Sequence, residues 1–298
     1  MCKVRSGRQR MATFGHVPWW NADYTPDECY QELLVSLDEL KDQTNGEVAK
    51  AFADELFVTL VWCSNFTEGT LPNTITELDT FKLLQHHLNA LDASEPCDSA
   101  ALCEWSADGG TSESEVRAQL VQHLRAFKFA DQKAKKNAPI TVEFVKQLHA
   151  ILMKGAKDVE PGEFRCGPVY SGTGYVYPPA SYVPKSLANA IDRFNEDSTD
   201  CFLVRIARLF YDLLIIHPFS DGNGRVSRLV AVYAIRVIGK VPFFCNLNNG
   251  HRRSRDHYIQ VLKYADKHGQ NTSRIATFLL ECIDVNMRNL KSWLYLLG

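Results

Sequence analysis

The sequence predicts an all-α fold with one short β-hairpin. Apolar residues recur at helical spacing along most of the chain, as in Leu33, Leu37 and Leu40. Helix-start patterns precede several of these stretches. One segment, GPVYSGTGYVYPP at residues 167–179, instead places aromatic and β-branched residues on both sides of a glycine-rich turn, which is typical of a hairpin.

Three helices are expected in the N-terminal part. TPDE at residues 25–28 is a helix start, with Thr at the cap, Pro at the first helical position and Glu completing a capping box. A second helix is expected from about Glu47 to Glu68, where Gly69 can supply a left-handed C-cap. A third begins at a capping-box pattern, TITE at residues 74–77. Residues 92–114 are small, acidic and Gly/Ser-rich, and predict a long connecting loop.

Helical periodicity continues through the rest of the chain, on both sides of the predicted hairpin. These helices are expected at residues 116–127, 141–152, from Pro184 onward, 202–216, 225–239, 257–266 and 275–290. The apolar segments at 202–216 and 226–239 enclose the nine-residue stretch HPFSDGNGR, residues 217–225.

Composition narrows the class of protein. The 298 residues include 45% hydrophobic and 23% charged residues, which is ordinary for a soluble globular chain. A net charge of −2 argues against a general nucleic-acid binder. No apolar run approaches the ~20 residues that span a bilayer, and no apolar segment follows the basic first ten residues, so neither a membrane protein nor a secretory signal is expected. Nine cysteines without a CxxC pair predict reduced thiols in an intracellular, cytoplasmic protein.

The stretch at residues 217–225 combines groups suited to phosphate chemistry. Gly222, Asn223 and Gly224 precede a helix start, where unpaired backbone N–H groups and the helix dipole favour anions. Arg225 and Arg228 share one face of the first turn and can grip phosphate oxygens; they lie beside the same loop.

Two further groups in the same stretch complete the chemistry. Asp221 is a hard oxygen ligand for Mg²⁺ bound to phosphates. His217 can exchange a proton near neutral pH. Each part alone is more often a structural feature of a helix–turn–helix connection. Their conjunction within twelve residues favours phosphoryl or nucleotidyl transfer.

The segment HPFSDGNGRVSR resembles the signature of the Fic family, H-x-F-x-[D/E]-G-N-G-R-x-x-R, and matches it at every specified position. The resemblance extends to KQLHAILMKG (146–155), PGEFR (161–165), the 169–179 segment, which is similar to the family's substrate-docking flap, and RDHYIQVLKYAD (255–266). It implies a Fic-fold helical bundle: a catalytic domain at 111–298, with its core at about 140–285, and an N-terminal helical region at 1–110.

The resemblance implies transfer of AMP from Mg-ATP to a Ser, Thr or Tyr hydroxyl of a target protein. His217 would accept the hydroxyl proton, and Asp221 would hold Mg²⁺. Gly222, Asn223 and Gly224 would stabilise charge on the α-phosphate. Arg225, Arg228 and Tyr258 would bind ATP, and Phe219 would pack in the core. The resemblance also implies homodimerisation, as in other family members.

A second resemblance lies at residues 64–69, SNFTEG. Ser64, Glu68 and Gly69 fit the inhibitory-helix pattern [S/T]-x-x-x-E-[G/N] of Fic proteins. A carboxylate paired with Arg228 would occupy the guanidinium that should hold the γ-phosphate. The sequence therefore predicts an adenylyltransferase autoinhibited by Glu68.

Two alternatives remain open at the level of sequence. The same fold could remove AMP with a water positioned by Glu68, or transfer phosphate or phosphocholine; a glycine at position 224 argues against the kinase-like Doc branch, which commonly has lysine there. A catalytically silent interaction module would not need His217, Asp221 and both arginines intact.

Overall fold

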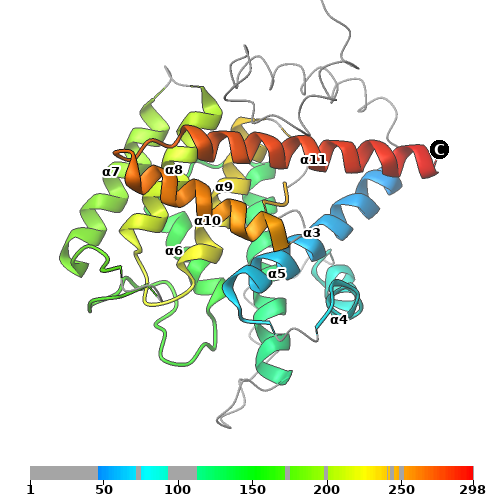
Figure 1. Ribbon diagram of the computed structural model, residues 1–298. Helices are drawn as coiled ribbons and strands as arrows, with labels where there is room; N and C mark the ends of the chain where they lie inside the picture. Colours follow the sequence, from blue (N-terminus) through cyan, green and yellow to red (C-terminus); the bar gives the residue numbers. More distant parts are fainter. Residues whose placement is uncertain are drawn as a thin grey trace, which may run out of the picture.

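The computed structural model describes residues 46–71, 75–92, 113–171, 175–197, 201–239, 241, 245–247 and 252–297. These residues form a helical bundle (Figure 1), as predicted. Its elements are α3 (Gly46–Glu68), α4 (Glu77–Asp92), α5 (Glu113–Lys135), α6 (Val142–Leu152), the 3₁₀ turn η2 (Ala180–Tyr182), α7 (Val183–Glu196), α8 (Phe202–Ile216), α9 (Asn223–Ile238), α10 (Arg252–Lys267) and α11 (Ser273–Leu297).

The N-terminal boundaries follow local signals. Gly69 has φ of +73°, and its N–H and that of Thr70 bond back to the last turn of α3, which confirms the left-handed C-cap. The cap of α4 is Thr76: its hydroxyl accepts from the Asp79 N–H at 3.1 Å, and the Asp79 carboxylate accepts from the Thr76 N–H at 3.0 Å. The capping box is therefore Thr76–Asp79, two residues later than expected. The predicted start at residues 25–28 and most of the loop predicted at 92–114 lie outside the described residues.

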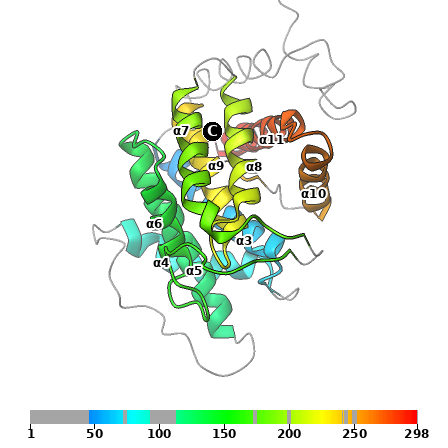
Figure 2. The same cartoon turned by 90° about the vertical axis from the view of Figure 1, so that its left-hand side faces the viewer.

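The centre of the bundle is the helical hairpin of α8 and α9. Figure 2 shows these two helices side by side, with α7 next to α8 and with α11 beyond, in agreement with the packing of α8 on α7, α9 and α11. Twelve residues of α9 are buried, including Val226, Leu229 and Tyr233. A helix surrounded by other helices is apolar on every face, which explains the near-continuous apolar segments around the 217–225 stretch.

Helix α3 belongs to the same hydrophobic core. Leu60 and Val61 of α3 are in one buried cluster with Leu229 of α9 and Leu279 of α11. The helix packs on α4, α5, α9 and α11. Across the described ranges, no helix is both long enough and apolar enough to cross a membrane.

The segment predicted as a hairpin contains one antiparallel bridge instead of two strands. Tyr170 and Val176 form that bridge. The N–H of Ser171 donates to the Tyr175 carbonyl at 2.9 Å, and that of Tyr177 donates to the Val169 carbonyl at 3.2 Å. The turn itself, 172–174, lies outside the described residues. We call the described residues of this segment, 167–171 and 175–178, the flap.

Candidate active site

The loop between α8 and α9 is built on two left-handed residues. His217 ends α8 with φ of 49° and ψ of 63°, and Gly222 precedes α9 with φ of 75°. A Cβ on Gly222 would lie 2.8 Å from the Met153 sulfur, so glycine is needed there for space as well as for backbone conformation. The chain thereby reverses between two long helices within six residues, 217–222.

Asn223 holds this loop closed from inside. Its Oδ1 accepts from the Phe219 N–H, and its Nδ2 donates to the Phe219 carbonyl, both at 2.9 Å. The side chain is buried, so it is committed to the loop's own backbone. Phe219 is fully buried, as predicted, and its ring stacks on the His149 ring at 3.7 Å. What Asn223 offers to a ligand is therefore its backbone N–H, in a helix turn whose first N–H groups have no i−4 partner.

His217 has one ring nitrogen engaged. Its Nδ1 lies 3.2 Å from the Leu214 carbonyl, which can only accept, so Nδ1 carries the proton and Nε2 is left with its lone pair. Burial lowers the pKa of His217 and Arg165 adds to that, while the Leu214 carbonyl and the Glu68 and Asp221 carboxylates oppose it. The net shift is downward, so the imidazole is neutral at pH 7.

Arg225 and Asp221 form an ion pair where the loop joins α9. Arg225 Nη2 lies 3.2 Å from the Asp221 carboxylate, with the arginine side chain 3% exposed and the aspartate 64% exposed. Arg225 Nη1 also reaches Gln119 on α5 at 3.5 Å, and its Nε has no hydrogen-bond partner among the described residues. A buried positive charge, on Arg225, and an exposed negative charge, on Asp221, therefore both lie at the start of α9.

Arg228 is joined to α3 by three hydrogen bonds. Its Nε donates to the Ser64 hydroxyl at 2.9 Å, and its Nη2 donates to the Ser64 carbonyl at 3.1 Å and to Glu68 Oε1 at 2.5 Å. Burial raises the pKa of Glu68, but Arg228, aided by Arg225 and His217, outweighs burial, so the net shift is downward. The Glu68 carboxylate is ionised and paired.

Tyr258 lies behind this pair. Its side chain is buried between the rings of Phe210 and Phe278, and its hydroxyl is a hydrogen-bond partner of Arg228. Burial raises the pKa of Tyr258 to about 12, so the phenol is neutral. The hydroxyl is engaged by Arg228, and contact of Tyr258 with ATP stays a prediction from the resemblance. In the structure described, Tyr258 helps to orient that guanidinium.

The Glu68 carboxylate lies directly over the start of α9. A Cβ placed on Gly224 would come 2.3 Å from Glu68 Oε1 and 3.3 Å from Arg228 Nη1. Gly224 therefore leaves the space that the carboxylate fills. The first turn of α9 receives an anion here, as a helix N-terminus with unpaired N–H groups should.

The structure adds two residues that the sequence did not single out. His149 accepts from the Gly162 N–H at Nδ1 (2.8 Å), and its Nε2 lies 3.1 Å from the Asp221 carbonyl. Burial, as the largest cause, lowers the pKa of His149 to about 4. Arg165 makes several hydrogen bonds to backbone carbonyls at the loop. Both residues lie in segments that resemble the Fic core, but their roles have no local sequence signal.

The predicted groups thus converge from two distant segments. His217, Asp221, Gly222, Asn223, Gly224, Arg225 and Arg228 surround the start of α9, and Ser64 and Glu68 reach it from α3. The described residues contain no group of three or more His, Cys, Asp or Glu side chains that could hold a metal by themselves. One open carboxylate beside an anion site nevertheless suits Mg²⁺, which is commonly held by one or two carboxylates together with substrate phosphates.

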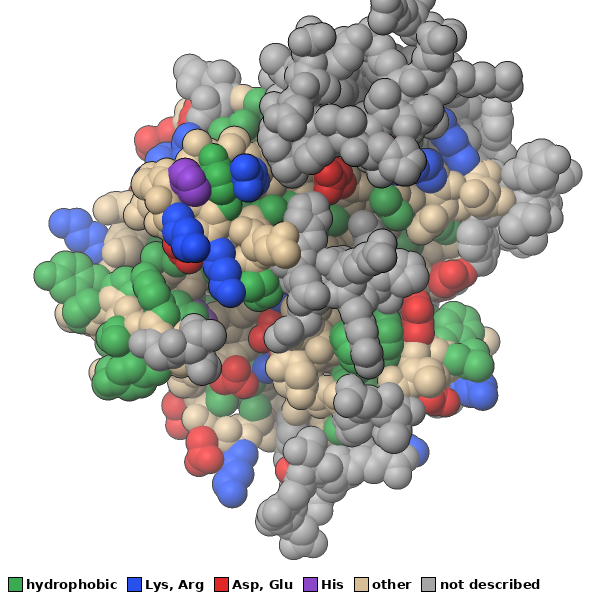
Figure 3. All heavy atoms as spheres, viewed as in Figure 1, with side chains coloured by type: hydrophobic (Ala, Val, Ile, Leu, Met, Phe, Trp, Pro, Cys, Tyr) green, Lys and Arg blue, Asp and Glu red, His purple; other side chains and the backbone are tan. Residues whose placement is uncertain are grey.

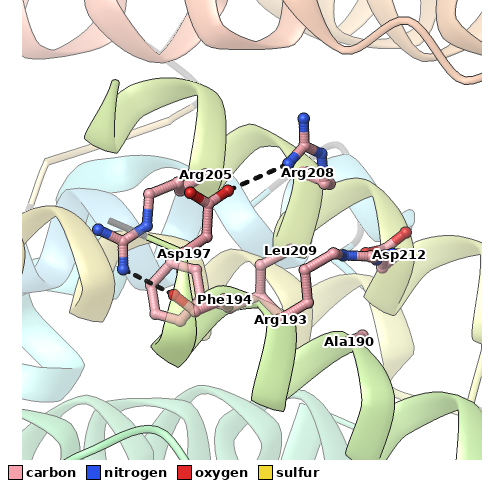
Figure 4. A pocket seen from close by; sticks show the side chains of 8 residues that line it. All are labelled: Ala190, Arg193, Phe194, Asp197, Arg205, Arg208, Leu209 and Asp212. Atoms are coloured by element: carbon pink, nitrogen blue, oxygen red, sulfur yellow. Dashed lines mark hydrogen bonds and ion pairs between the residues drawn. The ribbon is translucent and has the colours of Figure 1, made fainter. Parts of the chain in front are cut away.

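A hollow between α7 and α8 has a different character (Figure 4). It is open to solvent and is lined by Ala190, Arg193, Phe194, Asp197, Arg205, Arg208, Leu209 and Asp212. Two of its three arginines are paired with carboxylates, Arg193 with Asp212 and Arg208 with Asp197 at 3.4 Å. Arg205 donates to the Phe194 carbonyl at 2.6 Å, and its Nε has no hydrogen-bond partner among the described residues. These contacts tie α7 to α8.

The flap and the start of α7 carry an exposed apolar surface. Tyr170, Tyr175, Val176 and Tyr182 are between 47% and 63% exposed. In Figure 3, hydrophobic side chains gather on the left-hand side of the view, over the segment between α6 and α7. Tyr177 of the flap stacks on the His217 ring at 3.7 Å, so this surface adjoins the candidate base.

Comparisons with known proteins identify a family and similar sequences. Residues 139–235 match the Fic/DOC family model. A protein adenylyltransferase Fic from Drosophila grimshawi is 30% identical over 249 residues, which are 80% of this chain and 45% of the relative. One from Aedes aegypti is 34% identical over 137 residues, 44% of this chain and 26% of the relative. This chain spans less than half the length of these relatives.

Solved structures share the fold. Fic-1 (residues 134–508) from C. elegans superposes with a TM-score of 0.71 at 19% identity, covering 92% of this chain and 74% of that one. A Fic-domain-containing signalling protein from Bacteroides thetaiotaomicron gives 0.68 at 21% identity, covering 89% and 95%.

Proposed function

We propose that this chain, a member of the Fic/DOC family by its domain at residues 139–235, transfers AMP from Mg-ATP to a hydroxyl side chain of a target protein and is restrained by Glu68. The observation that carries the proposal is the position of the Glu68 carboxylate. It lies against Gly224 and Arg228, at the place where the first turn of α9 would receive a phosphate. The similarity of the chain to protein adenylyltransferases from a fly and a mosquito supports the reaction class.

In the proposed reaction, His217 is the general base. A Ser, Thr or Tyr hydroxyl of the target gives its proton to Nε2, and the hydroxyl oxygen forms a bond to the α-phosphorus of ATP. The bond between the α-phosphorus and the bridging oxygen breaks, and pyrophosphate leaves. The lowered pKa of His217 and the Nδ1–H bond to the Leu214 carbonyl support this role, because they keep Nε2 unprotonated and oriented.

The start of α9 would bind the triphosphate. Backbone N–H groups of Gly222, Asn223 and Gly224 would stabilise negative charge on the α-phosphate. Arg225, which has an unpaired Nε, and Arg228 would bind the β- and γ-phosphates. The exposed carboxylate of Asp221 would hold Mg²⁺, and a bound Mg²⁺ would offset the charge of the phosphates.

Glu68 would restrain the reaction by competing with ATP for the same groups. While Glu68 Oε1 is 2.5 Å from Arg228 Nη2, that guanidinium cannot hold a phosphate. ATP would then bind in a pose in which the α-phosphate is not aligned with His217. The apolar surface of the flap would contact the target protein. Homodimerisation and an intracellular, cytoplasmic location stay predictions from the sequence and the resemblance.

The test uses purified chain and ATP labelled at the α- or the γ-phosphate. We expect wild type to modify itself weakly, Glu68→Gly to retain more α-label on protein, and Glu68→Gly/His217→Ala to retain none while remaining folded by circular dichroism. Retention of γ-label alone would instead indicate phosphate transfer. Equal α-label on wild type and Glu68→Gly would rule out restraint by Glu68. Faster loss of preformed AMP-protein with Glu68 present than absent would favour AMP removal.

A further inference from the structure

Arg165 is buried, and its guanidinium donates only to backbone carbonyls. Its Nε donates to His217 at 2.7 Å, its Nη1 to Gly167 at 3.0 Å, and its Nη2 to Pro178 and, at 3.4 Å, to Ile216. Its own N–H donates to the Pro218 carbonyl at 3.0 Å. The four side-chain bonds use all three nitrogens of the guanidinium.

These carbonyls lie in two segments that are separated in the sequence, the end of α8 and the flap. Those of Ile216 and His217 are at the end of α8, where the candidate base sits. Those of Gly167 and Pro178 are at the two ends of the flap. One planar side chain thus bonds both ends of the flap to the backbone of the candidate base, which a planar fork of donors can do and a point charge cannot.

The contact on the other side of His217 completes the arrangement. Tyr177, one residue before Pro178, stacks its ring on the imidazole at 3.7 Å and 19°. His217 is a non-glycine residue at φ of 49°, a conformation that persists only when its surroundings enforce it. Arg165 on the carbonyl and Tyr177 on the ring are two such constraints, and both act through the flap.

We propose that Arg165 is a positioning residue that registers the flap on the candidate base, so that a target segment held by the flap meets His217 Nε2. The proposal rests on the proposed AMP transfer. It assigns to Arg165 an effect on use of the target protein and not on binding of ATP, because its guanidinium bonds carbonyls of the flap and of the end of α8 and none at the start of α9.

The activity test uses the Glu68→Gly background, with a His217→Ala copy of the chain as the acceptor protein. We expect Arg165→Lys and Arg165→Gln to lower kcat/KM for the acceptor by about 10- to 100-fold, the cost of a misplaced reacting group. KM for ATP should change less than about twofold, the size of effect expected of a substitution away from the nucleotide site, because the Arg165 guanidinium bonds no group at the start of α9. Arg193→Lys and Arg193→Gln, which alter an arginine in the hollow between α7 and α8, are the matched controls and should change neither parameter.

A second readout does not depend on activity. The ring of Tyr177 shifts the NMR signals of the His217 imidazole, and Tyr177→Leu supplies the unstacked value. Both Arg165 variants are expected to move those signals toward the Tyr177→Leu position. If lysine at 165 keeps the wild-type signals and wild-type use of the acceptor, the proposal is wrong.

Folding and the parent reaction are controlled separately. Should neither Arg165 variant fold, Tyr177→Leu carries the test, since it must show the same acceptor-specific loss; an unchanged kcat/KM there also overturns the proposal. Absence of any AMP transfer by the Glu68→Gly parent would contradict the proposed function instead, and the NMR comparison would still decide whether Arg165 sets the stack.

Discussion

Replacing Glu68 by glutamine tests the ion pair at the centre of the site. The change keeps an oxygen that can accept from Arg228 but removes the charge, so the buried guanidinium is left with neutral partners, Ser64 and Tyr258. Truncating one member of a fully buried pair costs roughly 3–5 kcal/mol. Because the Glu68 side chain is 31% exposed and an acceptor remains, we expect the free energy of unfolding to fall by about 1–3 kcal/mol without nucleotide.

The same variant should respond more strongly to ATP. Wild type must displace Glu68 from Arg228 before that arginine can hold a phosphate, and Glu68→Gln has a weaker contact to displace. If the pair weakens ATP binding tenfold, a saturating concentration of Mg-ATP stabilises wild type by about 1.4 kcal/mol less than the variant. The assay is urea unfolding of both proteins with and without Mg-ATP. Opposite signs are thus expected for the two conditions: a loss without ATP and a larger gain with it.

Glu77→Gln is the matched control. It also removes one negative charge near α3 and keeps an acceptor for the Thr59 hydroxyl, but it does not touch Arg228. The control should bind ATP as wild type does. Equal stabilisation by ATP of wild type and Glu68→Gln would refute the reasoning, because it would mean that Glu68 and the nucleotide do not compete.

Three further predictions concern the loop. Burial holds the pKa of His149 at about 4 in the folded protein, against an ordinary value of 6.5, so acid favours the unfolded state below about pH 6.5. At pH 5, wild type should have lost about 2 kcal/mol of unfolding free energy that the His149→Gln variant does not lose. Urea unfolding at pH 7 and pH 5 measures this, with a substitution of the exposed His268, His268→Gln, as the control. Asn223→Ala leaves both Phe219 backbone groups without their partner, and we expect a loss of about 2–4 kcal/mol by thermal or urea unfolding; a loss under 0.5 kcal/mol would contradict the role of this side chain in closing the loop. Gly222→Ala strains a φ of 75° and pushes on Met153, so a loss of at least about 1 kcal/mol is expected, and an unchanged midpoint in the same assay would contradict it.

Local signals fixed the helix ends that the sequence could predict. Glu47 to Glu68 was expected and Gly46–Glu68 is observed, because Gly69 can end a helix whatever packs around it. The start of α4 was misplaced because two threonines, at 74 and 76, each precede an acidic residue by three positions. Which threonine caps a helix depends on where the helix packs, and that is a tertiary matter.

The side-chain partners inside the site could not be predicted in the same way. Motif spacing indicates that Asn223 is near phosphate, but not that its amide closes the loop on Phe219. It does not show that His149 and His217 carry their protons on opposite nitrogens, since each tautomer follows from a neighbour distant in sequence or from the fold of the loop. The bond of His149 to the Asp221 carbonyl arises from the packing of α6 against α9, whereas those of Asn223 and His217 depend on the left-handed turns of the loop between α8 and α9.

Packing also limits how Glu68 can leave the site. Phe52, Leu56, Val58, Leu60 and Val61 of α3 are buried in the common core, and exposing each costs roughly 1.5–3 kcal/mol. Detaching the helix would therefore consume about 10 kcal/mol, comparable to the whole stability of a domain. Glu68 is the last residue of α3, and Gly69 follows it in a left-handed turn. A change confined to this last turn breaks the pair with Arg228 and leaves the core intact, so the energetically accessible release is local, at the C-terminal end of a helix that stays in place.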